Sequence, residues 1–169
     1  LRTVAAGHSG DVAGIRHLEQ QLIRQCQAFP DRAEFWADLA EAQQYLAEML
    51  AVTDRPGALR VAHACRESVT RAMSLGDARR AQNIRNLAMN DVVLAWLNAG
   101  IIPAEQLLDS AERAVDMMCK VFAEDFSNNF IRGQHVQVLM TFATAGERIA
   151  NAAPAPAQSI ARREIASRV

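Results

Sequence analysis

The chain has 169 residues, a formal net charge of −1 at pH 7, 50% hydrophobic residues and only 5% aromatic residues. This length suits one domain, or roughly three to four stacked repeat units. The near-zero charge argues against nucleic acid as a partner, because phosphate binding depends on clustered Lys and Arg. Abundant Ala with few aromatic side chains favours closely packed helices over β-sheets.

Cysteine usage and hydropathy indicate the compartment. Cys26, Cys65 and Cys119 are odd in number, far apart and without CxxC spacing, which predicts reduced thiols instead of a disulfide framework or a zinc site. The sequence contains no run of roughly 18 apolar residues, so no membrane span is expected. The first residues carry neither an initiator Met nor a signal pattern. Lys120 is the only lysine among 18 basic residues, as in a GC-rich bacterial gene. We therefore expect a cytoplasmic bacterial chain without membrane contact, cut from a longer protein.

The chain is predicted to be all-α, with about seven helices. Apolar residues recur three and four positions apart, for example Leu39, Leu46 and Leu50. Short stretches rich in Gly, Pro, Asn and Asp interrupt this pattern, so sequential helices are expected to be antiparallel. The predicted helices cover residues 11–28, 32–52, 56–74, 77–98, 103–124, 128–151 and 157–167.

The residues at the expected helix ends agree with this assignment. Pro56 and Pro103 suit a first helical turn, because proline lacks the amide hydrogen that this turn leaves unpaired. Asp77 suits the N-cap of the fourth helix. Gly76 and Gly100 suit left-handed helix stops.

An internal repeat emerges when the turns are aligned. The turns near Gly10, Thr53, Gly100 and Gly146 follow one another at about 43, 47 and 46 residues. An amphipathic helix precedes each later turn, and a second helix rich in small residues follows each. Such helix pairs stack because one pair alone cannot bury its apolar face. We therefore expect one helical repeat domain over residues 1–152, and a Pro/Ala linker with a C-terminal helix or tail over residues 153–169.

The small and apolar positions of the first pair carry a resemblance to a known family. They are Phe35-Trp36-Ala37-Asp38-Leu39-Ala40, Leu46, Leu50, Asp54, Pro56-Gly57-Ala58-Leu59, Ala62 and Ser68. Over roughly residues 7–122 the chain resembles the tetratricopeptide-like (TPR-like) repeats of large bacterial signalling proteins, in a long variant, although Asn83 replaces an expected aromatic residue. The resemblance implies a short right-handed α-solenoid whose first helices line a groove that holds peptides or partner domains.

Side-chain amides are the first candidates for partner binding. Gln43, Asn90 and Gln137 fall at equal spacing, one on the first helix of each pair, where stacking would align them. Amides in a groove bond an extended peptide backbone through both donor and acceptor. The alternative is that these are ordinary polar residues at exposed helix positions.

Basic and aromatic residues supply further candidates. Arg79 and Arg80, together with Arg85 and Arg71, are placed to form a basic spot for an acidic peptide, with a solvated helix face as the alternative. Core packing is the default for Trp36, Trp96, Tyr45 and the six Met residues, which lie mostly on apolar helix faces, and Trp36 alone is also a candidate for an exposed aromatic anchor.

No pattern in the sequence predicts catalysis or a cofactor. His63 and Glu67 lie four residues apart, but two ligands make no metal site. His8, His17 and His135 have no Ser, Cys or carboxylate at a motif spacing. Phosphate loops, HExxH and GxSxG are missing from the sequence. We expect a protein without catalytic, metal or cofactor sites.

Three functions are compatible with these observations. The first is a module that binds a protein or peptide, within a larger bacterial signalling or regulatory protein. The second is a structural domain that self-assembles through the two exposed ends of its helix stack. A homo-oligomer is therefore one of the expected forms of the chain. The third is a compact helical bundle that binds a small ligand in a sensory role.

Overall fold

The computed structural model describes residues 12–76, 80–124 and 127–152. Every regular element among them is an α-helix, so the predicted all-α class is confirmed. The helices are α1 (Val12–Ala28), α2 (Ala33–Leu50), α3 (Arg55–Ser74), α4 (Arg80–Leu97), α5 (Ala104–Glu124) and α6 (Asn129–Ala152). The linker and helix expected beyond residue 152, and the expected cap Asp77, lie outside the described residues.

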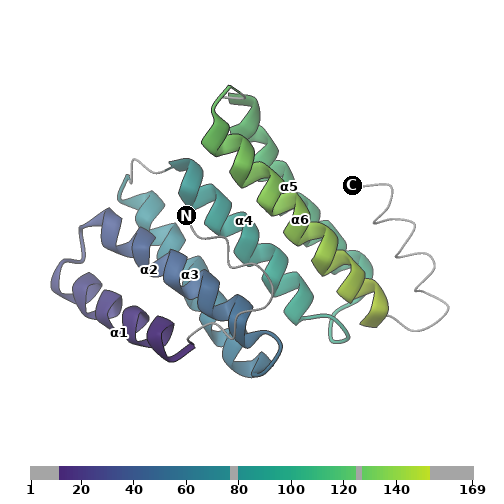
Figure 1. The fold of residues 1–169 in the computed structure, drawn as a ribbon, viewed down its shortest axis with the longest axis horizontal. Coiled ribbons are helices and arrows are strands. Elements are labelled where there is room, and N and C mark those ends of the chain that lie inside the picture. Colours follow the sequence, from purple (N-terminus) through teal and green to yellow (C-terminus); the bar gives the residue numbers. More distant parts are fainter. Residues whose placement is uncertain (1–11, 77–79, 125–126, 153–169) are drawn as a thin grey trace. The chain divides into compact units, whose positions relative to one another are not determined.

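The six helices belong to two compact units. The N-terminal unit, Leu1–Gly76, holds α1 to α3, and the C-terminal unit, Asp77–Val169, holds α4 to α6 (Figure 1). Within each unit short turns join helices that pack against each other, which gives antiparallel neighbours. The single repeat domain and the solenoid stay predictions.

The N-terminal unit is organised around α2, which packs against both α1 and α3. The buried residues of α2 and α3, which pack against each other, include the small Ala40, Ala47, Ala62 and Cys65. The Cys65 thiol lies 3.3 Å from the Ala40 carbonyl oxygen, which shows how closely the two backbones approach. Alanine permits this approach without loss of helix propensity. The abundance of Ala in the sequence is thus explained by close helix packing.

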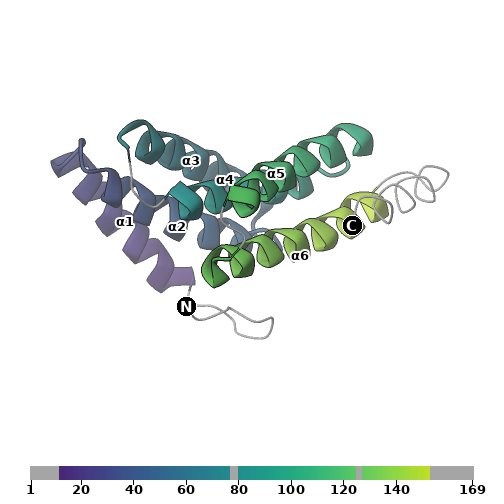
Figure 2. The ribbon, with the colours of Figure 1, turned by 90° about the horizontal axis from the view of Figure 1, so that it is seen from above.

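The C-terminal unit is a three-helix arrangement in which α4, α5 and α6 all contact one another. Its core contains the fully buried side chains of Leu108, Met118, Val138, Phe142 and Ile149. The three α6 residues of this set share one side of the helix, because they recur at intervals of four and seven. With 24 residues, α6 is the longest helix described, and it runs without interruption in Figure 2.

Two helix ends follow the sequence prediction closely. Gly76 and Gly100 adopt φ angles of 77° and 81°, the left-handed conformation expected of them at the ends of α3 and α4. At the start of α3, Pro56 lies in the first turn, and Asp54 is the N-cap. The Asp54 carboxylate accepts a hydrogen bond of 2.9 Å from the backbone amide of Gly57.

Replacing Asp54 by Ala should lower the free energy of unfolding by about 1 kcal/mol, because the amide of Gly57 loses its acceptor. Urea denaturation of the two proteins measures the difference. Asp54→Asn is the matched control, since Asn also caps helices and should recover most of the loss. An unchanged stability in Asp54→Ala would show that this cap does not hold α3 in solution.

Candidate functional site

Gln43, the first member of the predicted amide row, is an interior residue of the N-terminal unit. Its side chain is on α2 and is 3% exposed. The amide nitrogen donates to the Glu19 carboxylate of α1 at 3.3 Å, and the amide oxygen accepts from the Ser68 hydroxyl of α3 at 2.8 Å. Gln43 therefore joins all three helices of its unit. The exposed position that the sequence suggested for it is wrong.

Asn90, the second member, belongs to a group of buried amides on α4. Asn83, Asn86 and Asn90 are all 0% exposed, and their spacing of three and four places them on one side of the helix. We call these three residues the buried amide stripe. Ile84 and Val92, which enter the core of the C-terminal unit, lie on the opposite side of α4.

The members of the buried amide stripe differ in their hydrogen bonds. The Asn86 oxygen accepts from Arg85 at 2.8 Å and from Gln82 at 3.2 Å. Both amide atoms of Asn83 and of Asn90 have no hydrogen-bond partner among the described residues. A buried amide without a partner normally destabilises the fold by about 1–3 kcal/mol. Asn83 and Asn90 are therefore buried amides on α4 that lack the hydrogen bonds usual for buried polar groups, among the described residues.

The structure describes only part of the predicted basic group around Arg79 and Arg80. The described arginines of this group are engaged in contacts within the protein. Arg79 lies outside the described residues. Arg85 is buried and bonds Asn86, so its assignment to an exposed face is wrong. Arg80 of α4 forms an ion pair with Glu124 of α5. The hydrogen bond from Arg80, with its positive charge, holds the pKa of Glu124 below its ordinary value.

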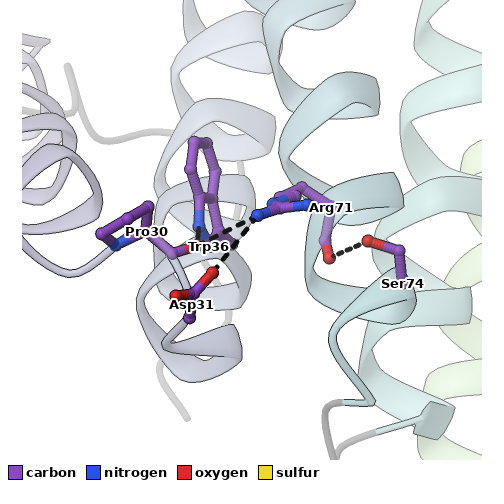
Figure 3. Close-up of polar contacts among 5 residues, drawn as sticks. All are labelled: Pro30, Asp31, Trp36, Arg71 and Ser74. Atoms are coloured by element: carbon purple, nitrogen blue, oxygen red, sulfur yellow. Dashed lines mark hydrogen bonds and ion pairs between the residues drawn. The ribbon is translucent and has the colours of Figure 1, made fainter.

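Trp36, the predicted aromatic anchor, is tied into the turn between α1 and α2. Its indole nitrogen donates to the carbonyl oxygen of Pro30 at 2.9 Å, and Arg71 of α3 reaches the same oxygen at 3.5 Å. The Arg71 guanidinium also lies 3.7 Å from the Asp31 carboxylate (Figure 3). The ring is half-buried against the cluster formed by Leu22, Cys26, Leu39 and Ala42. The contacts of Trp36 therefore stabilise the packing of α2 against α1 and the turn that joins them.

Gln137, the third member of the amide row, lies beside an exposed apolar surface on α6. Gln137 is half-buried, while the neighbouring Val136 is 54% exposed and Met140 is 67% exposed. Val136 and Met140 are one turn apart, on the side of α6 opposite Val138 and Phe142. The sequence assigned Met residues to the core, and for Met140 this is wrong. We define the α6 outer face as Arg132, Gly133, Val136, Met140, Ala143 and Glu147.

The α6 outer face is open and contains little that blocks a partner. A methyl group placed on Gly133 would meet no atom within 4 Å. Ala143 is half-buried, and Arg132 and Glu147 are exposed near the two ends of the surface. Apolar residues thus occupy the middle of the face, with opposite charges on either side.

The structure also brings together a thiol and an imidazole that the sequence did not connect. The sulfur of Cys119 on α5 lies 3.1 Å from Nε2 of His135 on α6, and the His135 ring stacks on Phe122 at a centroid distance of 4.8 Å. Burial, with a contribution from Asp116, raises the pKa of the Cys119 thiol, which disfavours a nucleophilic thiolate. Within residues 12–76, 80–124 and 127–152, no three His, Cys, Asp or Glu side chains gather as metal ligands would.

Two further findings bear on the class of protein. None of the helices in the described part of the chain is long and apolar enough to cross a membrane. Comparison with protein-family models, with curated protein sequences and with solved structures finds no match to this chain. The class is therefore defined by the fold: an all-α protein of antiparallel helices, with an exposed apolar face on α6.

Proposed function

We propose that this chain is a non-catalytic helical module that binds a polypeptide partner through the α6 outer face. The exposure of Val136 and Met140 one turn apart carries the proposal. Apolar side chains of a helix in a soluble protein normally face the core, and adjacent exposed ones mark interaction surfaces. Gln137, at the edge of this surface, offers both a donor and an acceptor to a partner.

An amphipathic helix is the kind of partner that best fits this surface. The exposed ridge of α6 is formed by residues four apart, and ridges of this kind pack into the groove of a second helix. Gly133 and Ala143 are small, so a second helix backbone can approach closely beside Val136 and Met140. The partner helix would carry an apolar stripe between polar borders.

We further propose that the chain is TPR-like and works in the bacterial cytoplasm, within a larger signalling or regulatory protein. Within each unit, antiparallel helices of similar length follow one another, which supports the repeat assignment. Cys26, Cys65 and Cys119 form no disulfide within the described part of the chain, and a reducing compartment is compatible with this. In this setting, binding through α6 would connect the module to another protein.

Selection from a phage-displayed library of helical peptides of about 20 residues, a length that covers most of α6, tests the proposed surface. Selected peptides should carry apolar residues three and four apart. Their affinity for the variants Val136→Asp and Met140→Asp should fall at least about tenfold, because a charge replaces an apolar contact. Titration by fluorescence anisotropy measures the dissociation constants.

Leu18→Asp is the matched control, because Leu18 on α1 is also a large apolar residue, 42% exposed. This variant should bind the selected peptides as the parent chain does. Circular dichroism should show all three variants folded, since exposed positions usually tolerate substitution within about 0.5 kcal/mol. Failure to select any peptide, or equal affinity for all the variants, would refute the α6 outer face as a binding surface.

A further inference from the structure

The polypeptide that binds the α6 outer face is, we infer, a second copy of this chain. Two α6 helices would pack antiparallel across a two-fold axis, each offering its outer face to the other. The inference rests on the proposed binding at this face and adds the identity of the partner. It comes from the order of charged, large and small residues along the α6 outer face.

The charges at the two ends of the face are complementary in an antiparallel pair. Arg132 lies near the beginning of α6 and Glu147 near its end, both exposed on the outer side of the helix. About 22 Å of helix separates them. When a second α6 runs in the opposite direction, each Arg132 meets the Glu147 of the other copy, which gives two ion pairs. A parallel arrangement would place like charges side by side instead.

The same register also matches the apolar residues by size. In an antiparallel pair that places Arg132 opposite Glu147, Val136 lies opposite Ala143 of the other copy. The two Met140 side chains meet at the centre of the interface. A large residue thus faces a small one on each side, and the flexible Met side chains fill the middle. One register therefore satisfies both the charges and the volumes.

Such a surface is self-complementary, which is the property that a two-fold interface requires. The same patch serves both copies, so the interface closes after two chains and does not extend into a filament. The exposed face of one helix is a small interface, and we expect a reversible dimer. Gly133 has no side chain, and no atom lies within 4 Å of the place that a Cβ atom would occupy there, so a second helix can approach at this point.

Light scattering coupled to size-exclusion chromatography, over a series of concentrations of the full 169-residue chain, tests the inference. The mass should rise from 18.5 kDa towards twice that value as the concentration increases. Arg132→Glu and Glu147→Arg should each weaken dimerisation about tenfold, since each change replaces two attractive pairs by two repulsive ones. The doubly exchanged chain, with Arg132→Glu and Glu147→Arg together, should recover the dissociation constant of the parent chain.

Arg113→Glu, at an exposed position of α5, is the control charge reversal and should leave the mass profile unchanged. A chain that stays at 18.5 kDa up to millimolar concentration would overturn the inference. A double exchange that dimerises no better than the single changes would overturn it as well. If selected peptides bind a strictly monomeric chain at Met140, binding at α6 stands and only the second copy as partner is refuted.

Discussion

Replacing Gln43 by Ala should lower the free energy of unfolding by about 2–4 kcal/mol, although the sequence suggested an exposed position. The substitution leaves a cavity between three helices and removes the acceptor of the Ser68 hydroxyl and the donor to Glu19. Each loss is destabilising, because a buried polar group without its partner costs about 1–3 kcal/mol and the cavity adds to this. Urea denaturation followed by circular dichroism measures the change.

Gln137→Ala is the matched control, since Gln137 is also an amide on a first helix of a predicted pair but is only half-buried. Its substitution should change the stability by no more than about 0.5 kcal/mol. Ser68→Ala should fall between the two, because it removes one hydrogen bond and little volume. A Gln43→Ala variant as stable as Gln137→Ala would mean that water, and not the protein, surrounds the Gln43 amide in solution.

The helices were predictable because their signals are local. The predicted second and fifth helices, residues 32–52 and 103–124, correspond to Ala33–Leu50 and Ala104–Glu124 in the structure. Apolar periodicity gives the extent of a helix, and breakers give its ends. Gly76 was predictable for the same reason, because a left-handed helix end depends on one residue that lacks a Cβ atom.

The partners of polar side chains were not predictable, because they come from other helices. Gln43 bonds residues 24 and 25 positions away, and the regular spacing of the amide row carries no information about these contacts. Likewise, Cys119 and His135 meet only once α5 and α6 have packed. Arginine is rarely buried, so sequence reasoning placed Arg85 outside, whereas its guanidinium bonds Asn86 in the interior.

The α6 outer face escaped prediction for a different reason. Apolar residues occur on all sides of α6, so the pattern of the sequence alone does not separate the side that enters the core from the side that stays exposed. Val138 and Phe142 turn inward, while Val136 and Met140, two positions earlier along the chain in each case, turn outward. The outer side carries the charged Arg132 and Glu147 but also Val136 and Met140, and it is the packing of α4 and α5 against the other side that leaves these two apolar residues exposed.

Asn83→Leu and Asn90→Leu should each raise the free energy of unfolding by about 1–2 kcal/mol. Leucine has nearly the shape of asparagine, and it removes a buried amide whose nitrogen and oxygen lack partners among the described residues. Thermal and urea unfolding of the single variants and of the double variant measure the gain. Residues that lower stability in this way are often retained for function, so the binding assays for α6 should be repeated on these variants.

Asn86→Leu is the decisive comparison, because it makes the same chemical change within the same stripe but removes the oxygen that accepts from Arg85 and Gln82. Its stability should fall by about 3 kcal/mol, since the buried guanidinium loses an acceptor. The two kinds of position should therefore respond with opposite signs. If Asn83→Leu or Asn90→Leu also lowers the stability, the amide at that position has partners in solution and the stripe holds α4 in place along its whole length.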